Sequence, residues 1–131
     1  EYAFAEASAR ECELIAVHTW MDMQIQASLA GLSAAQQQWK IVEEEQNMLL
    51  GHRLAGYAER YPDVQVTRVV TRDRPVRALV DAAKGAQLLV VGSHGRGGFK
   101  GMLLGSTSRA LLQSAPCPMM VVRPDSDAKA H

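Results

Sequence analysis

The most informative segment of this chain runs from Leu88 to Thr107 and reads LLVVGSHGRGGFKGMLLGST. Its first part, Leu88–Gly92, is apolar and rich in valine, which is typical of a strand buried on both faces. A glycine-rich loop follows, and Ser106 then begins a predicted helix over 106–114. In open α/β sheets, ligands bind at the carboxyl ends of the strands. The segment therefore predicts an α/β fold with a ligand site at this turn.

Strand and helix patterns alternate along the rest of the chain. Runs of apolar and β-branched residues predict three further strands, at 14–20, 64–71 and 118–123. Alanine-rich composition predicts a helix at 1–11, and apolar residues spaced three and four apart predict one at 36–61. Pro75 at the start and Gly85 at the end predict a helix at 76–84. Strands joined through a helix in one sheet are almost always parallel, with a right-handed crossover. The predicted fold class is therefore a doubly wound parallel α/β sheet.

The composition argues against several classes of protein. The 131 residues carry 14 Lys and Arg against 14 Asp and Glu, and a net charge of zero argues against a nucleic-acid-binding surface. No apolar run approaches the roughly 20 residues of a membrane helix, and the acidic residues near the amino terminus are unlike a signal peptide. Cys12 and Cys117 lie far apart, which favours free thiols in a reducing compartment. We therefore expect a cytoplasmic protein that binds neither nucleic acid nor membranes.

The glycine-rich loop favours an anionic ligand. Glycines let successive backbone N–H groups point into one concavity, and hydroxyl residues at a helix amino terminus add to its positive end. Two known phosphate loops do not fit, because Gly101 rather than Ser or Thr follows Lys100, and because the residue three after Gly97 is Lys100 and not glycine. The spacing Gly92, Gly95, Gly105, Ser106 defines a different loop, one that suits a di- or triphosphate.

This loop resembles that of the universal stress protein family. The resemblance extends to SAPCPMMVVRP after the loop and to LIAVHTW upstream, and it is most marked with tandem-domain actinobacterial members. It implies that residues 1–124 form a universal stress protein domain with a Rossmann-like, doubly wound, parallel five-stranded sheet whose first, central strand is not found in this sequence. The polar segment 125–131 is predicted to be a flexible tail. The resemblance also implies a dimer, or a pseudo-dimer with a tandem domain, through the edge strand Pro118–Arg123.

The resemblance further implies an ATP site, occupied with or without Mg²⁺. The backbone of Val17 matches the family position that meets the adenine edge. The residues that match the positions around the ribose and phosphates are Gly92, Ser93, His94, Gly95, Arg96, Gly97 and Gly98. Those that match the positions holding the phosphate tail are Gly105, Ser106 and Thr107. No catalytic pair and no metal-ligand spacing is found in the sequence.

One part of the family pattern is missing from the sequence. The family places a segment resembling GVDGS directly after a first, central strand, whereas Glu1–Glu11 resembles the helix that follows that segment. Without the central strand, the strands at 14–20 and 88–92 would each leave backbone groups unpaired in the interior, at about 1–3 kcal/mol per group. We therefore expect the chain to be a fragment or a tandem half, with the first strand supplied from elsewhere and no direct pairing of these two strands.

The function expected from the resemblance is nucleotide-dependent regulation of stress or growth arrest. Three alternatives remain open: a domain of the same fold that binds no nucleotide, a slow ATP-hydrolysing enzyme, and a purely structural dimerisation module. Without a recognisable catalytic pair, a binding module is favoured over an enzyme.

Overall fold

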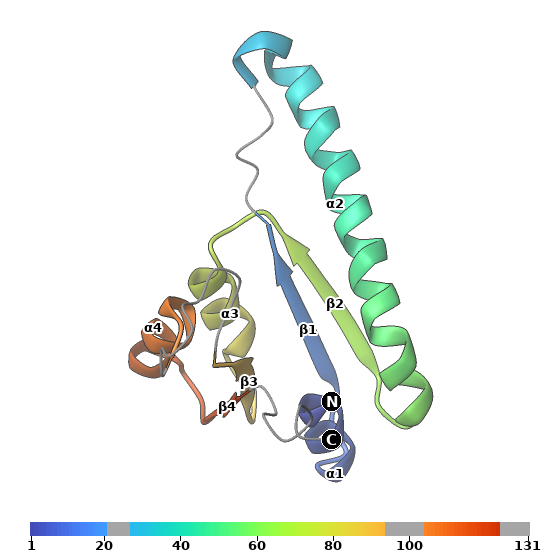
Figure 1. The fold of residues 1–131 in the computed structure, drawn as a ribbon, viewed down its shortest axis with the longest axis vertical. Coiled ribbons are helices and arrows are strands. Elements are labelled where there is room, and N and C mark those ends of the chain that lie inside the picture. The colour runs from blue at the N-terminus through green and yellow to red at the C-terminus, as the bar shows by residue number, and fades with distance from the viewer. Residues whose placement is uncertain (21–26, 94–103, 124–131) are drawn as a thin grey trace, which may run out of the picture. The chain divides into compact units, whose positions relative to one another are not determined.

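A computed structural model describes residues 1–20, 27–93 and 104–123, with the backbone alone for 27–37. The elements follow one another as α1 (Tyr2–Ala9), β1 (Leu14–Thr19), α2 (Ala27–Arg60), β2 (Val66–Thr71), α3 (Pro75–Ala83), β3 (Leu89–Gly92), α4 (Ser106–Ser114) and β4 (Met119–Val122) (Figure 1). The chain forms two compact units, residues 1 and 3–78 and residues 2 and 79–131, which are described separately.

The strands pair in parallel, as predicted. In the first unit β1 pairs with β2, with Leu14 opposite Val66 and Thr19 opposite Thr71. In the second, β3 pairs with β4, with Leu89 opposite Met119. Over the described ranges, β1 and β3 belong to different sheets, and no ladder joins them. A fifth strand between them stays a prediction.

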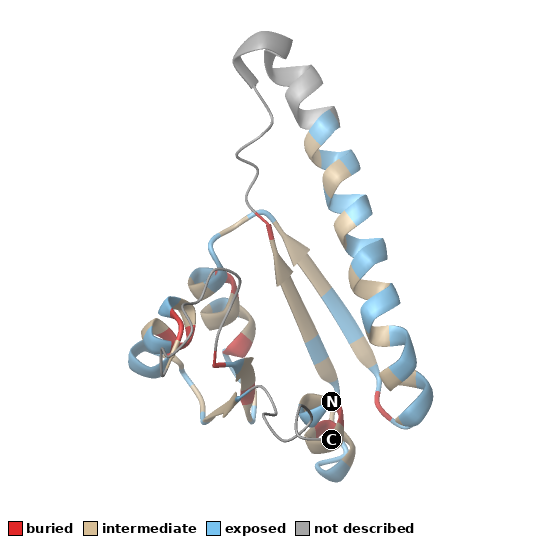
Figure 2. Ribbon diagram, in the orientation of Figure 1, coloured by how far each residue is buried: buried red, intermediate tan, exposed pale blue. Residues whose placement is uncertain are grey.

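The core of the first unit lies where α1 meets the end of α2. Phe4, Ala7 and Val64 are buried there. The Phe4 ring stacks on Tyr57 and Tyr61, with centroid distances of 5.8 and 6.0 Å. Elsewhere in this unit most described residues are half-buried or exposed (Figure 2). This small aromatic cluster therefore supplies much of the apolar burial of the first unit.

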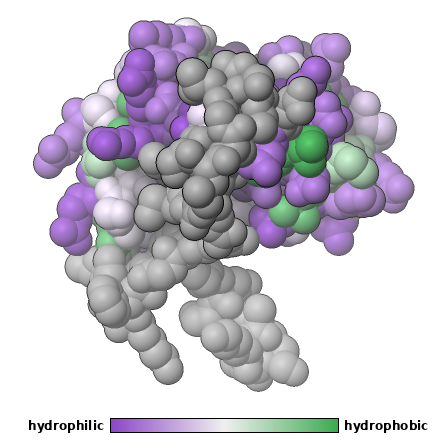
Figure 3. All heavy atoms as spheres, turned by 90° about the horizontal axis from the view of Figure 1, so that it is seen from above, coloured by the Kyte–Doolittle hydropathy of each residue, from purple (hydrophilic) through white to green (hydrophobic). Residues whose placement is uncertain are grey.

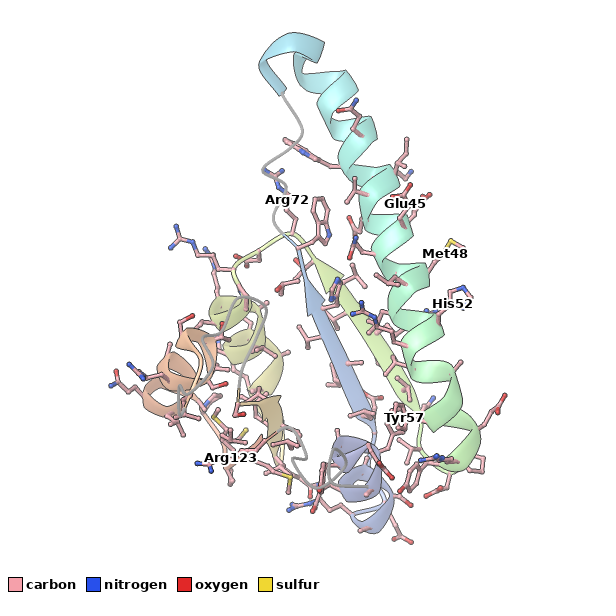
Figure 4. All side chains as sticks on the ribbon, viewed as in Figure 1. Glu45, Met48, His52, Tyr57, Arg72 and Arg123 are labelled. Atoms are coloured by element: carbon pink, nitrogen blue, oxygen red, sulfur yellow. The ribbon has the colours of Figure 1, made fainter. Side chains whose placement is uncertain are left out.

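The side of α2 that faces the strands makes polar as well as apolar contacts. The imidazole Nε2 of His18 donates to Oε1 of Gln46 at 2.7 Å. Nη1 of Arg68 donates to the carbonyl of Asn47 at 3.1 Å. At the carboxyl end of β2, the guanidinium of Arg72 lies 3.8 Å from the ring centroid of Trp39, a cation–π contact (Figure 4). These contacts fix which side of α2 faces the strands.

The helix boundaries agree with the sequence except at one end. The start predicted for the second helix, at 36, was wrong, because α2 already begins at Ala27. The segment ASLAGLSAAQQQ is rich in alanine, leucine and glutamine, whose high helix propensity extends the helix in the amino-terminal direction. The helix ends at Arg60, as expected from Pro62, because the residue before a proline avoids the α region.

The largest fully buried side chain described in the second unit, Leu111, lies in α4. Leu111 has no exposed surface, and Ala83 and Leu89 are also buried. The predicted bounds of α4, 106–114, are confirmed. Gly85, just after α3, takes a φ of +81°, which glycine adopts without the strain a Cβ would cause.

The described surface is mainly polar on the face seen in Figure 3. Figure 3 shows hydrophilic residues over most of the coloured surface of one face, with apolar residues in small separate groups. Among the described residues, no helix has both the length and the apolar character needed to cross a membrane.

Candidate functional site

The turn from β3 to α4 is closed at its base by backbone hydrogen bonds. The N–H of Ser93 donates to the carbonyl of Val122 at 2.8 Å, which extends the β3–β4 pairing by one residue. The carbonyl of Ser93 accepts from the N–H of Gly105 at 2.6 Å. Ser93 is fully buried. It therefore ties β4, the end of β3 and the start of α4 together.

A side chain adds a second connection across the same turn. The hydroxyl Oγ of Ser108, in the first turn of α4, donates to the carbonyl of Gly92 at 2.5 Å. Ser108 is buried, so this bond is partly shielded from water. We call Gly92, Ser93, Gly105 and Ser108 the clamp. The clamp holds the amino end of α4 against the carboxyl end of β3.

The first turn of α4 has backbone N–H groups that make no hydrogen bond within the helix. Gly105 is the N-cap in extended conformation, with φ −72° and ψ 168°, and it offers no side chain to cap the helix. The first intrahelical bond runs from the N–H of Arg109 to the carbonyl of Gly105 at 3.0 Å. The N–H groups of Ser106 and Thr107 therefore have no partner within the helix, and the first turn contains no acidic residue. This positive helix end suits an anion.

The structure brings five of the predicted site residues together. They lie in the clamp and in the first turn of α4: Gly92, Ser93, Gly105, Ser106 and Thr107. The other loop residues of the prediction fall outside the described residues: His94, Gly95, Arg96, Gly97 and Gly98.

Val17 lies in the first unit, opposite Val69 in the β1–β2 ladder. The N–H of Leu14 donates to the carbonyl of Gln65, just before β2, and the N–H of Trp20 donates to the carbonyl of Thr71, the last residue of β2. Because backbone groups of successive residues in a parallel strand point to opposite edges, the N–H and C=O of Val17 point away from β2. Its backbone is therefore oriented to hydrogen-bond a group other than β2.

Ser108 is the clamp residue that sequence reasoning missed. The sequence gives only a weak signal for this residue. Serine occupies a position in the first turn of the predicted helix where an apolar residue would be expected to face the interior. The structure also shows that Cys12 and Cys117 are free thiols. Across the described ranges, no group of three or more His, Cys, Asp or Glu residues could hold a metal ion.

We expect Ser108→Ala to lower the free energy of unfolding by about 1–3 kcal/mol, because it leaves the Gly92 carbonyl without its buried donor. Urea unfolding followed by circular dichroism measures this change. Ser106→Ala, at an exposed position of the same helix, is expected to change stability by about 0.5 kcal/mol or less. Equal losses in both variants would show that the Ser108 hydroxyl contributes no specific bond.

A family model described as the universal stress protein family matches residues 1–123, nearly the whole chain. The chain belongs to the universal stress protein family. Universal stress protein Rv2005c of Mycobacterium tuberculosis is 54% identical over 121 residues, which are 92% of this chain and 39% of that protein. The chain thus spans about two-fifths of the length of the curated relatives that it matches.

Two solved universal stress protein structures share the fold. UspA from Lactobacillus plantarum superposes with a TM-score of 0.73 and 18% identity, over 93% of this chain and 85% of that one. A universal stress protein in complex with cAMP gives a TM-score of 0.56 and 22% identity, over 92% and 84% of the two chains. The predicted Rossmann-like α/β class is confirmed.

Proposed function

We propose that this universal stress protein domain binds ATP at the β3–α4 turn and regulates stress or growth-arrest responses through nucleotide-dependent interactions. Membership of the family supports the regulatory role. The clamp is the observation that carries the site, because it holds the first turn of α4, whose Ser106 and Thr107 N–H groups have no partner within the helix, beside the carboxyl end of β3. Such donors match phosphate oxygens.

The donors of the site fit a phosphate chain better than a bare metal ion. Backbone N–H groups donate hydrogen bonds to phosphate oxygens and have no lone pair for a metal ion, whereas serine and threonine hydroxyls can donate to phosphate or offer a lone pair to a metal ion. The first turn of α4 contributes no carboxylate. Any Mg²⁺ would therefore accompany the phosphates of ATP and not occupy a protein-made site. Within the first unit, the backbone N–H and C=O of Val17 point away from β2, which is the orientation that contact with an adenine edge would require.

A binding role is favoured over turnover. Among the described residues, no hydrogen bond or ion pair joins Ser106 or Thr107 to an imidazole or carboxylate, as an activated nucleophile would require. ATP would then act by stabilising one state of the domain and of its partner surface. We place the protein in the cytoplasm, with a partner copy or tandem domain at the β4 edge.

Ser106→Asp tests the site without weakening the helix. A carboxylate near the amino end of α4 is favourable for the helix but repels phosphate oxygens. We expect ATP at 100 times its dissociation constant to stabilise the unmodified protein by about 2.7 kcal/mol, and Ser106→Asp to lose this effect. Thermal unfolding with and without ATP, with isothermal titration calorimetry, measures both quantities.

The matched control adds the same charge at the other end of the same helix. Gln113→Glu, at an exposed position, should keep the affinity for ATP. Competition by cAMP is a useful further arm, because a universal stress protein of this fold was solved with cAMP. Retained ATP binding by Ser106→Asp would contradict the proposed site. Absence of ATP binding by the unmodified protein would favour the dimerisation module, and turnover of ATP would favour the enzyme.

A further inference from the structure

The side of α2 that faces away from the strands carries an unpartnered row of side chains. Successive positions three or four residues apart place five exposed residues on this side, Ile41, Glu45, Met48, His52 and Ala55, which we call the outer row. Figure 4 shows Glu45, Met48 and His52 pointing away from β1 and β2. The opposite side of the helix, with Gln46 and Tyr57, makes the contacts within the unit.

The outer row exposes apolar and charged groups without partners. Met48 and Ile41 keep 65% and 55% of their surface exposed, which is high for large apolar residues. Glu45 and His52 take part in none of the hydrogen bonds or ion pairs of the described residues. A face with both properties is suited to a partner that supplies apolar contact at the centre and opposite polar groups on either side.

Two copies of the outer row that run in opposite directions match each other in charge and in side-chain size. Glu45 lies three residues before Met48 and His52 lies four residues after it. Ile41 lies seven residues before Met48, and the small residues Ala55 and Gly56 lie seven and eight after it. A two-fold axis at Met48 with antiparallel helices therefore sets each acidic position opposite a histidine and each bulky position opposite a small one.

The contacts that this axis creates are chemically favourable. Across this axis the carboxylate of Glu45 would accept a hydrogen bond from the imidazole N–H of the partner's His52, and the symmetric pair would form between the partner's Glu45 and His52 of this chain. Ile41 would lie over Gly56 of the partner subunit, a position where a methyl group would meet no atom of this chain within 4 Å. A parallel pairing would instead set Glu45 against Glu45, which is repulsive.

We propose that two copies of this chain associate through the outer row, as an antiparallel and symmetric pair of α2 helices. The row from Ile41 to Ala55 is about 21 Å long at 1.5 Å per residue, which is short for a permanent interface. The dimer is therefore weak and reversible, forming as the concentration rises. It is separate from the β4 edge and does not require a nucleotide.

Charge exchange on the row tests the pairing by complementation. Glu45→Lys places a cation opposite His52, and His52→Glu places two carboxylates together, so each variant alone should raise the dimer dissociation constant at least 10-fold. An equimolar mixture of the two variants should regain dimer, because in the mixed pair every lysine faces a carboxylate and Glu45 faces His52. Sedimentation velocity from tens to hundreds of micromolar, on the whole chain, measures the dimer fraction.

Asn47→Asp is the matched control, since it adds a charge on the flank of the same helix at an exposed position. It should leave the dissociation constant within about two-fold, and far-ultraviolet circular dichroism should show every variant folded. A mixture with no more dimer than either variant alone overturns the proposal. Full retention of the dimer in both single variants, or an unmodified chain that stays monomeric throughout this range, overturns it as well.

Discussion

Phe4→Ala is expected to lower the free energy of unfolding by about 3–5 kcal/mol, the range for removing a buried aromatic ring. Phe4 keeps only 2% of its surface exposed and stacks on Tyr57 and Tyr61 at 5.8 and 6.0 Å. Alanine would leave a cavity between α1 and the end of α2 and would remove both ring contacts. Because domains are stable by only about 5–15 kcal/mol in total, the loss is large.

Urea unfolding followed by circular dichroism would measure this change. Tyr2→Ala is the matched control, since it also removes an aromatic ring from α1 but at a position that is 60% exposed. Its effect should stay within about 0.5 kcal/mol. A small effect of Phe4→Ala would mean that α1 contributes little to the stability of the first unit.

Leu111→Ala should cost about 2–5 kcal/mol, by the loss of buried methyl groups and the cavity that remains. Leu111 has no exposed surface and anchors α4 in the second unit. Leu112→Ala, the next residue of the same helix and 55% exposed, provides a control of identical chemistry. We expect the control to unfold at nearly the same urea concentration as the unmodified protein.

The same substitution connects stability with the candidate site. α4 carries Ser106 and Thr107 at its start and Leu111 one to two turns later. A loosened α4 no longer holds its first turn against β3, so the ATP affinity of Leu111→Ala should fall together with its stability, while that of Leu112→Ala should not. Unchanged ATP affinity in a destabilised Leu111→Ala protein would indicate that the clamp alone positions the turn.

Local patterns predicted the elements well because each depends on neighbouring residues. Short apolar runs predicted the four strands. Ser106 at its start and the prolines at 116 and 118 after its end predicted α4. The start of α2 was missed because residues 27–35 lack a clear apolar period, although their intrinsic propensity favours a helix. Over residues 27–35, helix propensity determined the structure although the apolar spacing gave no signal.

The site was predictable only in part for a related reason. Gly92, Gly105 and Ser106 are joined by one strand–loop–helix segment, so their meeting follows from sequence order. The bond from Ser108 to the Gly92 carbonyl depends on how α4 is turned about its axis, which the spacing of glycines does not reveal. The contact of His18 with Gln46 joins residues 28 positions apart and depends on packing between elements.

The clamp also bears on how such a domain can diverge during evolution. In the hydrogen bonds described for the clamp, Gly92, Ser93 and Gly105 contribute backbone atoms and Ser108 contributes its hydroxyl. Backbone N–H and C=O groups are present whatever side chain a residue carries, so the bonds from Ser93 to Val122 and from Gly105 to Ser93 do not themselves depend on side-chain identity. Paralogues can therefore acquire new ligand preferences through side-chain mutations around this turn while these two backbone bonds are inherited.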